Sequence, residues 1–246
     1  MYRINREKND IIKMEKRLFS DLHFTERGHL QEWIAKHPDV LGEDLLIIQK
    51  EYAGFNDTKE RLDLLALDKD GGLVIIENKL DDTGRDVVWQ ALKYTSYCST
   101  LTTKQVIRLY QEYLDSTAAG EDAKELLMEF LGLEDDDGLA LNPEDQRIIF
   151  IANSYRKEVT STALWLLEHD INLQCFRATP YSFGAFCSST LVFLPSLATA
   201  SIVSTALPHT SLINSEASAP NSCAFRASLQ APVKSPKFFF EMPLLT

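Results

Sequence analysis

The segment DLLALDKDGGLVIIENK, residues 63–79, carries charged side chains on what otherwise resembles an apolar β-hairpin. Asp63 lies inside the first apolar run, and Glu77 and Lys79 end the second. An unpaired charge on a buried strand is costly. Because side chains alternate along a strand, Glu77 and Lys79 project from one face, about 6–7 Å apart. If the hairpin register brings Asp63 to that face, two carboxylates converge beside one ammonium group.

Two converging carboxylates repel each other unless a cation lies between them. Two carboxylates, a strand carbonyl and water molecules are ligands that suit Mg²⁺ or Mn²⁺. Lys79 could then orient or deprotonate a water, or stabilise negative charge on a phosphate. The alternative is structural: Lys79 pairs with Glu77 or Asp63 as a salt bridge at the sheet edge. The E-x-K tripeptide taken alone favours this alternative.

The length of the hairpin loop separates these interpretations. A two-residue loop at Asp70-Gly71 places the carboxylates of Asp63 and Glu77 on opposite faces of the sheet. A three-residue loop over residues 70–72 pairs Asp63 with Lys79 and puts all three charged groups on one face. Glycine supplies the left-handed conformation that a type I turn with a G1 bulge requires. We therefore predict an odd-length loop, or a bulge, and carboxylates close enough to share one ion.

Hydrophobic periodicity predicts the elements that position these groups. Expected helices cover residues 10–22, 25–37, 81–101, 104–131 and 157–170, and expected strands cover residues 45–52, 61–67, 73–80, 147–153 and 171–177. From residue 25 the order is helix, three strands, helices, strand, helix, strand. This order predicts an α/β fold with a mixed β-sheet flanked by helices.

The helix expected after the hairpin presents two polar side chains four residues apart. Gln90 and Tyr94 lie on one face of this helix, opposite its apolar stripe. A Gln amide can hold an attacking water or a phosphate, and a Tyr hydroxyl can donate to a phosphate oxygen. This pair adds groups suited to phosphodiester chemistry.

An Asp on the second strand, E-x-K on the third and Q-x-x-x-Y on the next helix resemble the PD-(D/E)XK, restriction-endonuclease-like, nuclease superfamily. The similarity is greatest to the branch that contains RecB-type and NucS-type endonucleases, and to nuclease-like bacterial proteins with the pattern HLQEWI, RLDLLALD, IIENKLDD and WQALKY. The resemblance implies a restriction-endonuclease-like αβββαβ core. It also implies roles for five residues: Asp63 and Glu77 as metal ligands, Lys79 as the catalytic lysine, and Gln90 and Tyr94 as the helix motif.

Such sites often contain a further acidic residue on the first core helix. Glu32 is the best match for this metal ligand, and Glu26 is the fallback. The sequence departs from the family pattern at two positions. Asn78 occupies the middle of E-x-K, where only its carbonyl would be used, and Leu62 replaces the usual proline before Asp63.

Composition changes abruptly near Gly184, where the resemblance also ends. Residues 185–246 contain no Asp and only two Glu, and they are rich in serine. We expect a helical lead-in over residues 1–24, a nuclease-like domain over 25–184, and a poorly structured tail over 185–246. A frameshifted reading of the gene would produce such a tail. The uncharged run 178–215 raises a membrane-spanning alternative, which Pro195 and the dense Ser and Thr disfavour.

The net charge of −11 argues against a broad basic surface for nucleic acid but permits a local cationic groove. Arg61, Arg85 and Lys93 lie close in sequence to the proposed site and could contact DNA phosphates. A solvated face of mixed charge is the alternative. Four widely spaced cysteines, without a C-x-x-C pair, and a first segment without an apolar signal predict a cytoplasmic protein.

These patterns together favour a Mg²⁺- or Mn²⁺-dependent endonuclease that hydrolyses phosphodiester bonds in DNA. Branched and single-stranded DNA are candidate substrates, and no membrane partner is expected. The alternative is a non-catalytic nucleic-acid-binding or scaffolding module on the same fold.

Overall fold

A computed structural model describes residues 1–54, 61–117, 120–135, 138–143, 146–182 and 189–197 of the 246-residue chain. All of these residues belong to one compact unit, Met1–Thr199. The second unit, Ala200–Thr246, lies outside the described residues.

A mixed β-sheet forms the centre of this unit. Within the described residues it has seven strands, in the order β3-β8-β7-β6-β5-β4 with β9 beside β8. They are β3 (Glu15–Lys16), β4 (Leu46–Tyr52), β5 (Leu62–Leu67), β6 (Leu73–Asn78), β7 (Arg147–Ala152), β8 (Leu173–Ser182) and β9 (Ser189–Leu197). β4, β5 and β6 are antiparallel, whereas β6, β7 and β8 run parallel.

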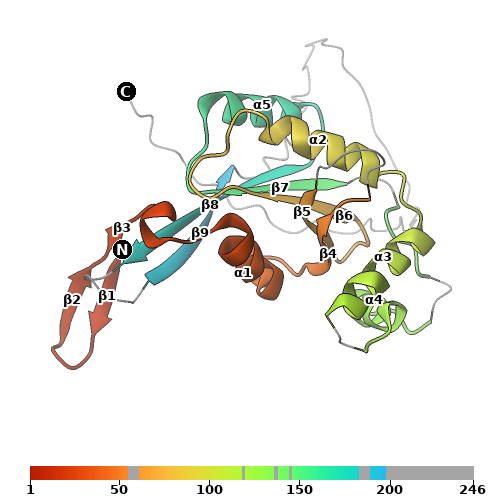
Figure 1. The fold of residues 1–246 in the computed structure, drawn as a ribbon, viewed down its shortest axis with the longest axis horizontal. Coiled ribbons are helices and arrows are strands. Elements are labelled where there is room, and N and C mark those ends of the chain that lie inside the picture. The colour runs from red at the N-terminus through yellow and green to blue at the C-terminus, as the bar shows by residue number, and fades with distance from the viewer. Residues whose placement is uncertain (55–60, 118–119, 136–137, 144–145, 183–188, 198–246) are drawn as a thin grey trace, which may run out of the picture. The chain divides into compact units, whose positions relative to one another are not determined.

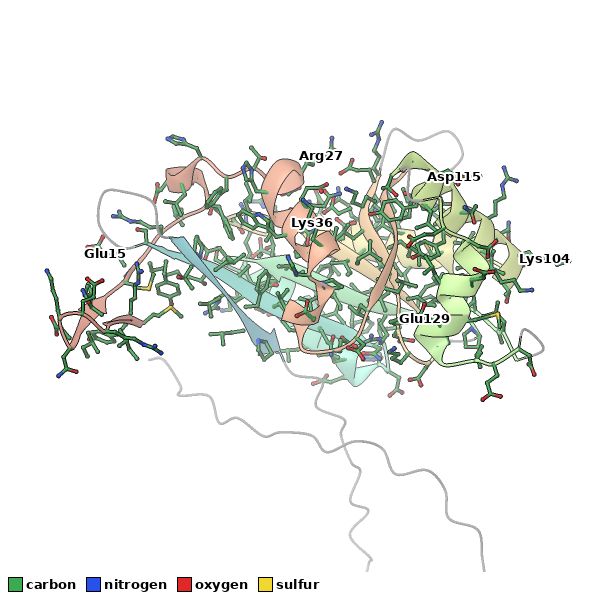
Figure 2. The ribbon with its side chains drawn as sticks, turned by 90° about the horizontal axis from the view of Figure 1, so that it is seen from below. Glu15, Arg27, Lys36, Lys104, Asp115 and Glu129 are labelled. Atoms are coloured by element: carbon green, nitrogen blue, oxygen red, sulfur yellow. The ribbon has the colours of Figure 1, made fainter. Side chains whose placement is uncertain are left out.

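Helices cover both faces of the sheet. They are η1 (Ser20–Leu22), η2 (Glu26–Leu30, one π-helical turn), α1 (Gln31–Lys36), η3 (Pro38–Leu41), α2 (Val87–Cys98), α3 (Thr103–Ser116), α4 (Ala123–Leu131) and α5 (Lys157–Glu168). Figure 1 shows α2 and α5 side by side over one face. Figure 2, seen from below, shows η2 and α1 in front of the sheet, with Arg27 and Lys36 labelled near their two ends. The predicted α/β fold with a mixed sheet flanked by helices is confirmed.

The central strands are apolar on both faces because each face is covered. Every residue of β5 and β6 is buried, as expected for strands that lie between two helical layers. Leu64 and Ile76 pack in the same cluster as Ile34 of α1. Leu65 and Ile75 pack in the cluster that contains α3 and α4. A charged residue on these two strands is therefore placed in the core of the protein.

The helix expected over residues 10–22 is wrong. β1 (Tyr2–Asn5) and β2 (Asp10–Lys13) form a separate antiparallel hairpin, with Asn9 in the left-handed conformation at φ 46° in its turn. The apolar residues at helical spacing do not form one buried stripe. Phe19 is fully buried, but Ile11 and Leu18 are 59% and 46% exposed. A helix here would bury little apolar surface, so the hairpin prevails.

The poorly structured tail expected after residue 184 is wrong for residues 189–197. These residues form β9, which pairs antiparallel with β8. Leu191 and Phe193 pack against the cluster on the α1 side of the sheet. Pro195 is accommodated because β9 pairs with one neighbour in the described chain, and edge strands tolerate proline. The frameshift hypothesis and the rest of the expected tail concern residues outside those described.

Within the ranges that the structure describes, no helix is both long enough and apolar enough to cross a membrane.

Candidate active site

The hairpin β5–β6 places the charged residues of the opening segment on one face. Leu64 lies opposite Ile76 in this antiparallel pair. Continuing the register by one residue places Asp63 opposite Glu77, and directly opposed residues project to the same side. Lys79 follows Glu77 by two residues and shares that side. The prediction of one shared face is confirmed, but the predicted pairing of Asp63 with Lys79 is wrong by two positions.

The loop of this hairpin has the predicted odd length but begins one residue earlier. It consists of residues 69–71, because the Asp68 N–H donates to the Gly72 carbonyl at 3.0 Å. Oδ1 of Asp68 accepts from the N–H groups of Asp70 and Gly72, at 3.1 and 2.8 Å. Gly71 takes the left-handed conformation at φ 79°. The capping carboxylate of Asp68 thus selects which glycine makes the turn.

Both carboxylates of the hairpin are almost fully buried. Asp63 is 6% exposed and Glu77 is 2% exposed. Oδ2 of Asp63 accepts from the Asn78 N–H at 2.8 Å, whereas Oε1 of Glu77 has no hydrogen-bond partner among the described residues. Burial raises the pKa of Asp63 to about 6. Burial, and then the charge of Asp63, raises the pKa of Glu77 well above its ordinary value.

Lys79 is the cation nearest to these acids. Its Nζ lies 3.4 Å from Oε1 of Glu26 and 3.9 Å from Oε2 of Glu77. Burial lowers the pKa of Lys79, but the charges of Asp63, Glu26 and Glu77 raise it by more. The side chain is 25% exposed, so part of it reaches solvent. Three carboxylates therefore hold Lys79 in its protonated form.

The acidic residue that the first helical segment brings to the site is Glu26. Besides pairing with Lys79, its charge raises the pKa of Asp63 and of Glu77. Glu32 lies six residues further along and pairs with Lys50, with Oε1 and Nζ 2.6 Å apart. The structure thus places the fallback residue beside the lysine, and the role of Glu32 as a metal ligand stays a prediction.

The residues predicted from the helix motif lie on α2, which packs against β6. Tyr94 is 2% exposed and shares a core cluster with Leu65 and Ile75. Those two residues alternate onto the same face as Asp63 and Glu77. Gln90, one turn before Tyr94, is half-buried. The motif therefore belongs to the helix that covers the site face.

The three predicted DNA-contacting cations lie in different environments. Arg61 is exposed and its Nη1 lies 3.9 Å from Oε2 of Glu51. Arg85 is exposed in the loop before α2. Lys93 is half-buried, with its Nζ 5.4 Å from the ring centre of Tyr94. Their contacts with DNA stay predictions.

A family model for the C-terminal domain of the endonuclease NucS matches residues 26–155. This range is more than half of the chain, and it contains the strand, lysine and helix residues described above. The chain belongs to this family. The predicted resemblance to NucS-type endonucleases is thereby confirmed.

One solved structure, "crystal structure of a repair endonuclease from Pyrococcus abyssi", is similar to this NucS-family chain at 16% sequence identity and a TM-score of 0.31. The match covers 63% of this chain and 48% of that chain, so it spans about half of the endonuclease. No curated protein matches the chain.

Two residues of this NucS-family domain that the sequence did not single out contact the same strands. Glu51 on β4 lies between the pairs Lys50–Leu64 and Tyr52–Leu62, and therefore opposite Asp63. Its charge raises the pKa of Asp63. A register shift between residues 47 and 49 of β4 hides this pairing from the sequence.

Gln31 of α1 is the second. Its Nε2 donates to the Asp63 carbonyl at 2.9 Å, and the residue is 2% exposed. The sequence pattern gives no signal for this residue, and only its contact with the strand identifies the buried amide as a neighbour of Asp63.

The donor set of the site suits a hard divalent cation. In the described part of the chain no group of three or more His, Cys, Asp or Glu side chains is arranged to hold a metal ion. The two buried carboxylates of Asp63 and Glu77, with the strand carbonyl of Asn78, are the oxygen donors that could do so. The unpartnered Oε1 of Glu77 fits a site for a cation, because a buried carboxylate oxygen without a partner is otherwise costly.

Proposed function

We propose that this chain is a divalent-metal-dependent endonuclease that hydrolyses phosphodiester bonds in DNA. The observation that carries the proposal is the pair of buried, directly opposed carboxylates, Asp63 and Glu77, beside the ammonium group of Lys79. Membership of a family named for an endonuclease domain supports the nucleic-acid substrate.

Asp63 and Glu77 are the proposed ligands of Mg²⁺ or Mn²⁺. When bound, the ion would polarise a phosphoryl oxygen and lower the pKa of a coordinated water. Oδ2 of Asp63 is held by the Asn78 N–H, and the Asp63 carbonyl is held by Gln31. These two hydrogen bonds fix the strand that presents the carboxylate, and such preorganisation keeps the ligands in place for the reaction.

Lys79 supplies positive charge at the reacting phosphate. Its raised pKa keeps the side chain an ammonium at neutral pH, which favours charge stabilisation over proton abstraction in the metal-free protein. Glu26, 3.4 Å from Nζ, helps to orient this ammonium group together with Glu77. Gln90 and Tyr94 of α2 are proposed to orient the phosphate from above the same face.

A cleavage assay tests the proposal. Purified full-length chain is incubated with duplex, flapped, branched and single-stranded DNA in Mg²⁺, Mn²⁺ or EDTA, and nicking is followed on denaturing gels. We expect cleavage that requires the metal ion and that falls by about 100-fold or more in Glu77→Gln and in Lys79→Ala, as for the loss of one group that stabilises a transition state.

Matched controls remove the same charges elsewhere. Glu129 of α4 and Lys104 of α3 are exposed, and Figure 2 labels both. Glu129→Gln and Lys104→Ala should retain wild-type cleavage. Equal cleavage by all four variants would identify a contaminating nuclease and reject the proposal. Metal-independent DNA binding without cleavage by the wild type would instead favour the non-catalytic binding module.

A further inference from the structure

Two arginines lie on either side of Glu51, next to the candidate active site. Nε of Arg27 is 3.3 Å from Oε1 of Glu51, and Nη1 of Arg61 is 3.9 Å from Oε2. Arg27 comes from η2, whereas Arg61 directly precedes β5. Their side chains are 67% and 52% exposed, against 24% for Glu51. The Glu51 carboxylate thus lies between two cationic side chains that are more exposed than it is.

Glu51 is held by charge rather than by hydrogen bonds. Both of its carboxylate oxygens are shielded from solvent and accept no hydrogen bond from the described residues. Its backbone has φ 53° within a strand, a conformation that is strained for a residue other than glycine. Each guanidinium carries five N–H donors, more than a single carboxylate contact uses. One negative charge also leaves the pair with a net positive charge.

Three connections place this pair beside the carboxylates of the candidate active site. Arg27 follows Glu26, which pairs with Lys79. Arg61 precedes Asp63 by two residues. Glu51 itself lies opposite Asp63 across the β4–β5 pair. The two guanidiniums therefore border the same strand ends that present the proposed metal ligands.

The surface beside the pair is hollowed. Arg27 and Glu51 line a recess of about 390 Å³, together with Lys50 and Tyr113. Glu32 also lines the recess and pairs with Lys50 at 2.6 Å, whereas Arg27 contacts Glu51 at the longer distance of 3.3 Å. A strand of nucleic acid that reached the carboxylates could continue along this recess.

We propose that Arg27 and Arg61 bind a backbone phosphate of the DNA strand beside the phosphate that is cleaved, and that Glu51 is a positioning residue for both guanidiniums. This inference rests on the proposed function. Arginine is suited to the task because its planar group donates two parallel hydrogen bonds to phosphate. A chain with a net charge of −11 also needs local cations to approach a polyanion.

The test measures the salt dependence of DNA binding without cleavage. Fluorescein-labelled duplex and single-stranded DNA are titrated with full-length chain in EDTA, by fluorescence anisotropy, between 50 and 200 mM KCl. Arg27→Gln and Arg61→Gln should each weaken binding and reduce the slope of log K against log salt, by up to about 0.9 for duplex or 0.7 for single strands, which is the contribution of one phosphate. Arg108→Gln, which removes an exposed arginine of α3, should leave the slope unchanged.

Glu51→Gln tests the positioning role through the sign of its effect. Removing one negative charge from the protein should by itself tighten binding to DNA. If Glu51 holds the two arginines in place, Glu51→Gln instead weakens binding and reduces the slope. Tighter binding by Glu51→Gln would overturn the positioning role, and circular dichroism verifies that each variant is folded.

The outcomes separate this inference from the proposed function. A wild type that cleaves DNA, with unchanged slopes in Arg27→Gln and Arg61→Gln, rejects the arginine site alone. A wild type that neither binds nor cleaves any of the DNA substrates rejects the proposed function, and the arginine site with it.

Discussion

Replacing Asp63 with Asn should stabilise the metal-free protein at neutral pH, although it removes a buried hydrogen-bonding charge. The two carboxylates of the hairpin face each other in the core. Burial raises the pKa of Asp63 from its ordinary value of 3.8 to about 6. The ionised form is therefore less stable in the native protein than in the unfolded chain. Asn keeps the shape and an acceptor for the Asn78 N–H, without the charge.

The magnitude follows from the shift in pKa. A rise of roughly 2 units corresponds to about 3 kcal/mol of lost stability once the group is ionised, at about 1.4 kcal/mol per unit. The hydrogen bond to a charged acceptor is stronger than one to a neutral amide by about 1 kcal/mol. Asp63→Asn should therefore gain about 2 kcal/mol at pH 7.5, which corresponds to a rise in Tm of roughly 4–8 °C for a chain of this length.

The gain in stability from Asp63→Asn depends on pH. A carboxyl with a raised pKa binds its proton in the native state between about pH 4 and 6, where the unfolded state has released it. Wild-type stability should thus fall as pH rises through this window, and the gain in Asp63→Asn should shrink to less than about 1 kcal/mol near pH 4. Thermal unfolding in EDTA at pH 4, 5, 6 and 7.5 measures both.

Asp70→Asn is the matched control, because Asp70 is exposed in the turn of the same hairpin. Its stability should lie within about 0.5 kcal/mol of the wild type. Adding Mg²⁺ at ten times its Kd should stabilise the wild type by about 1.4 kcal/mol and should have a smaller effect on Asp63→Asn. If Asp63→Asn is less stable than the wild type at pH 7.5 in EDTA, the cost of burying the ionised Asp63 carboxylate, on which this reasoning depends, is absent.

Two further predictions concern the other end of the hairpin and are checked by urea unfolding. Arg147→Ala should destabilise the protein by about 3 kcal/mol, because it leaves Glu43 and Asp68 without the guanidinium that contacts them at 2.7 and 3.1 Å. Arg147→Lys should recover part of this stability. A loss below about 1 kcal/mol in Arg147→Ala would contradict the prediction. Gly71→Ala should lower the free energy of unfolding by about 1–2 kcal/mol, because the residue has φ 79° and an added Cβ would lie 2.8 Å from the carbonyl oxygen of Ala140. A neutral effect would show that the turn can change its conformation.

The central part of the fold was predictable because its signals are local. β5 and β6 are continuous apolar runs, and strands covered on both faces have this composition. The parity of the hairpin loop followed from the need for a left-handed glycine. The choice of Gly71 over Gly72 did not, because it depends on the Asp68 side chain, which accepts from two N–H groups of the turn.

Tertiary contacts decided the features that the sequence did not predict. Glu26 and Glu32 both lie in the first helical segment, and only the position of that segment over the strands brings Glu26 to Lys79. A sparse apolar pattern near Ile11 fits helix and hairpin equally in isolation. β9 is a strand because it pairs with β8, and its own sequence has no periodicity that predicts a strand.

The position of Asp63 and Glu77 in the sheet also bears on their role. The alternative to a metal site was a structural salt bridge at a sheet edge, where water can solvate both partners. β5 and β6 instead lie inside the sheet order. There, burial raises the pKa of both carboxyls, and the charge of Asp63 raises the pKa of Glu77 further. The nearest cation contact of Glu77 among the described residues is 3.9 Å long. A buried carboxylate that lacks a close cation and a full set of hydrogen bonds ordinarily costs stability. Two opposed carboxylates at this depth are therefore better explained by a ligand that binds between them than by the stability of the fold. For this reason we propose that they bind a metal ion.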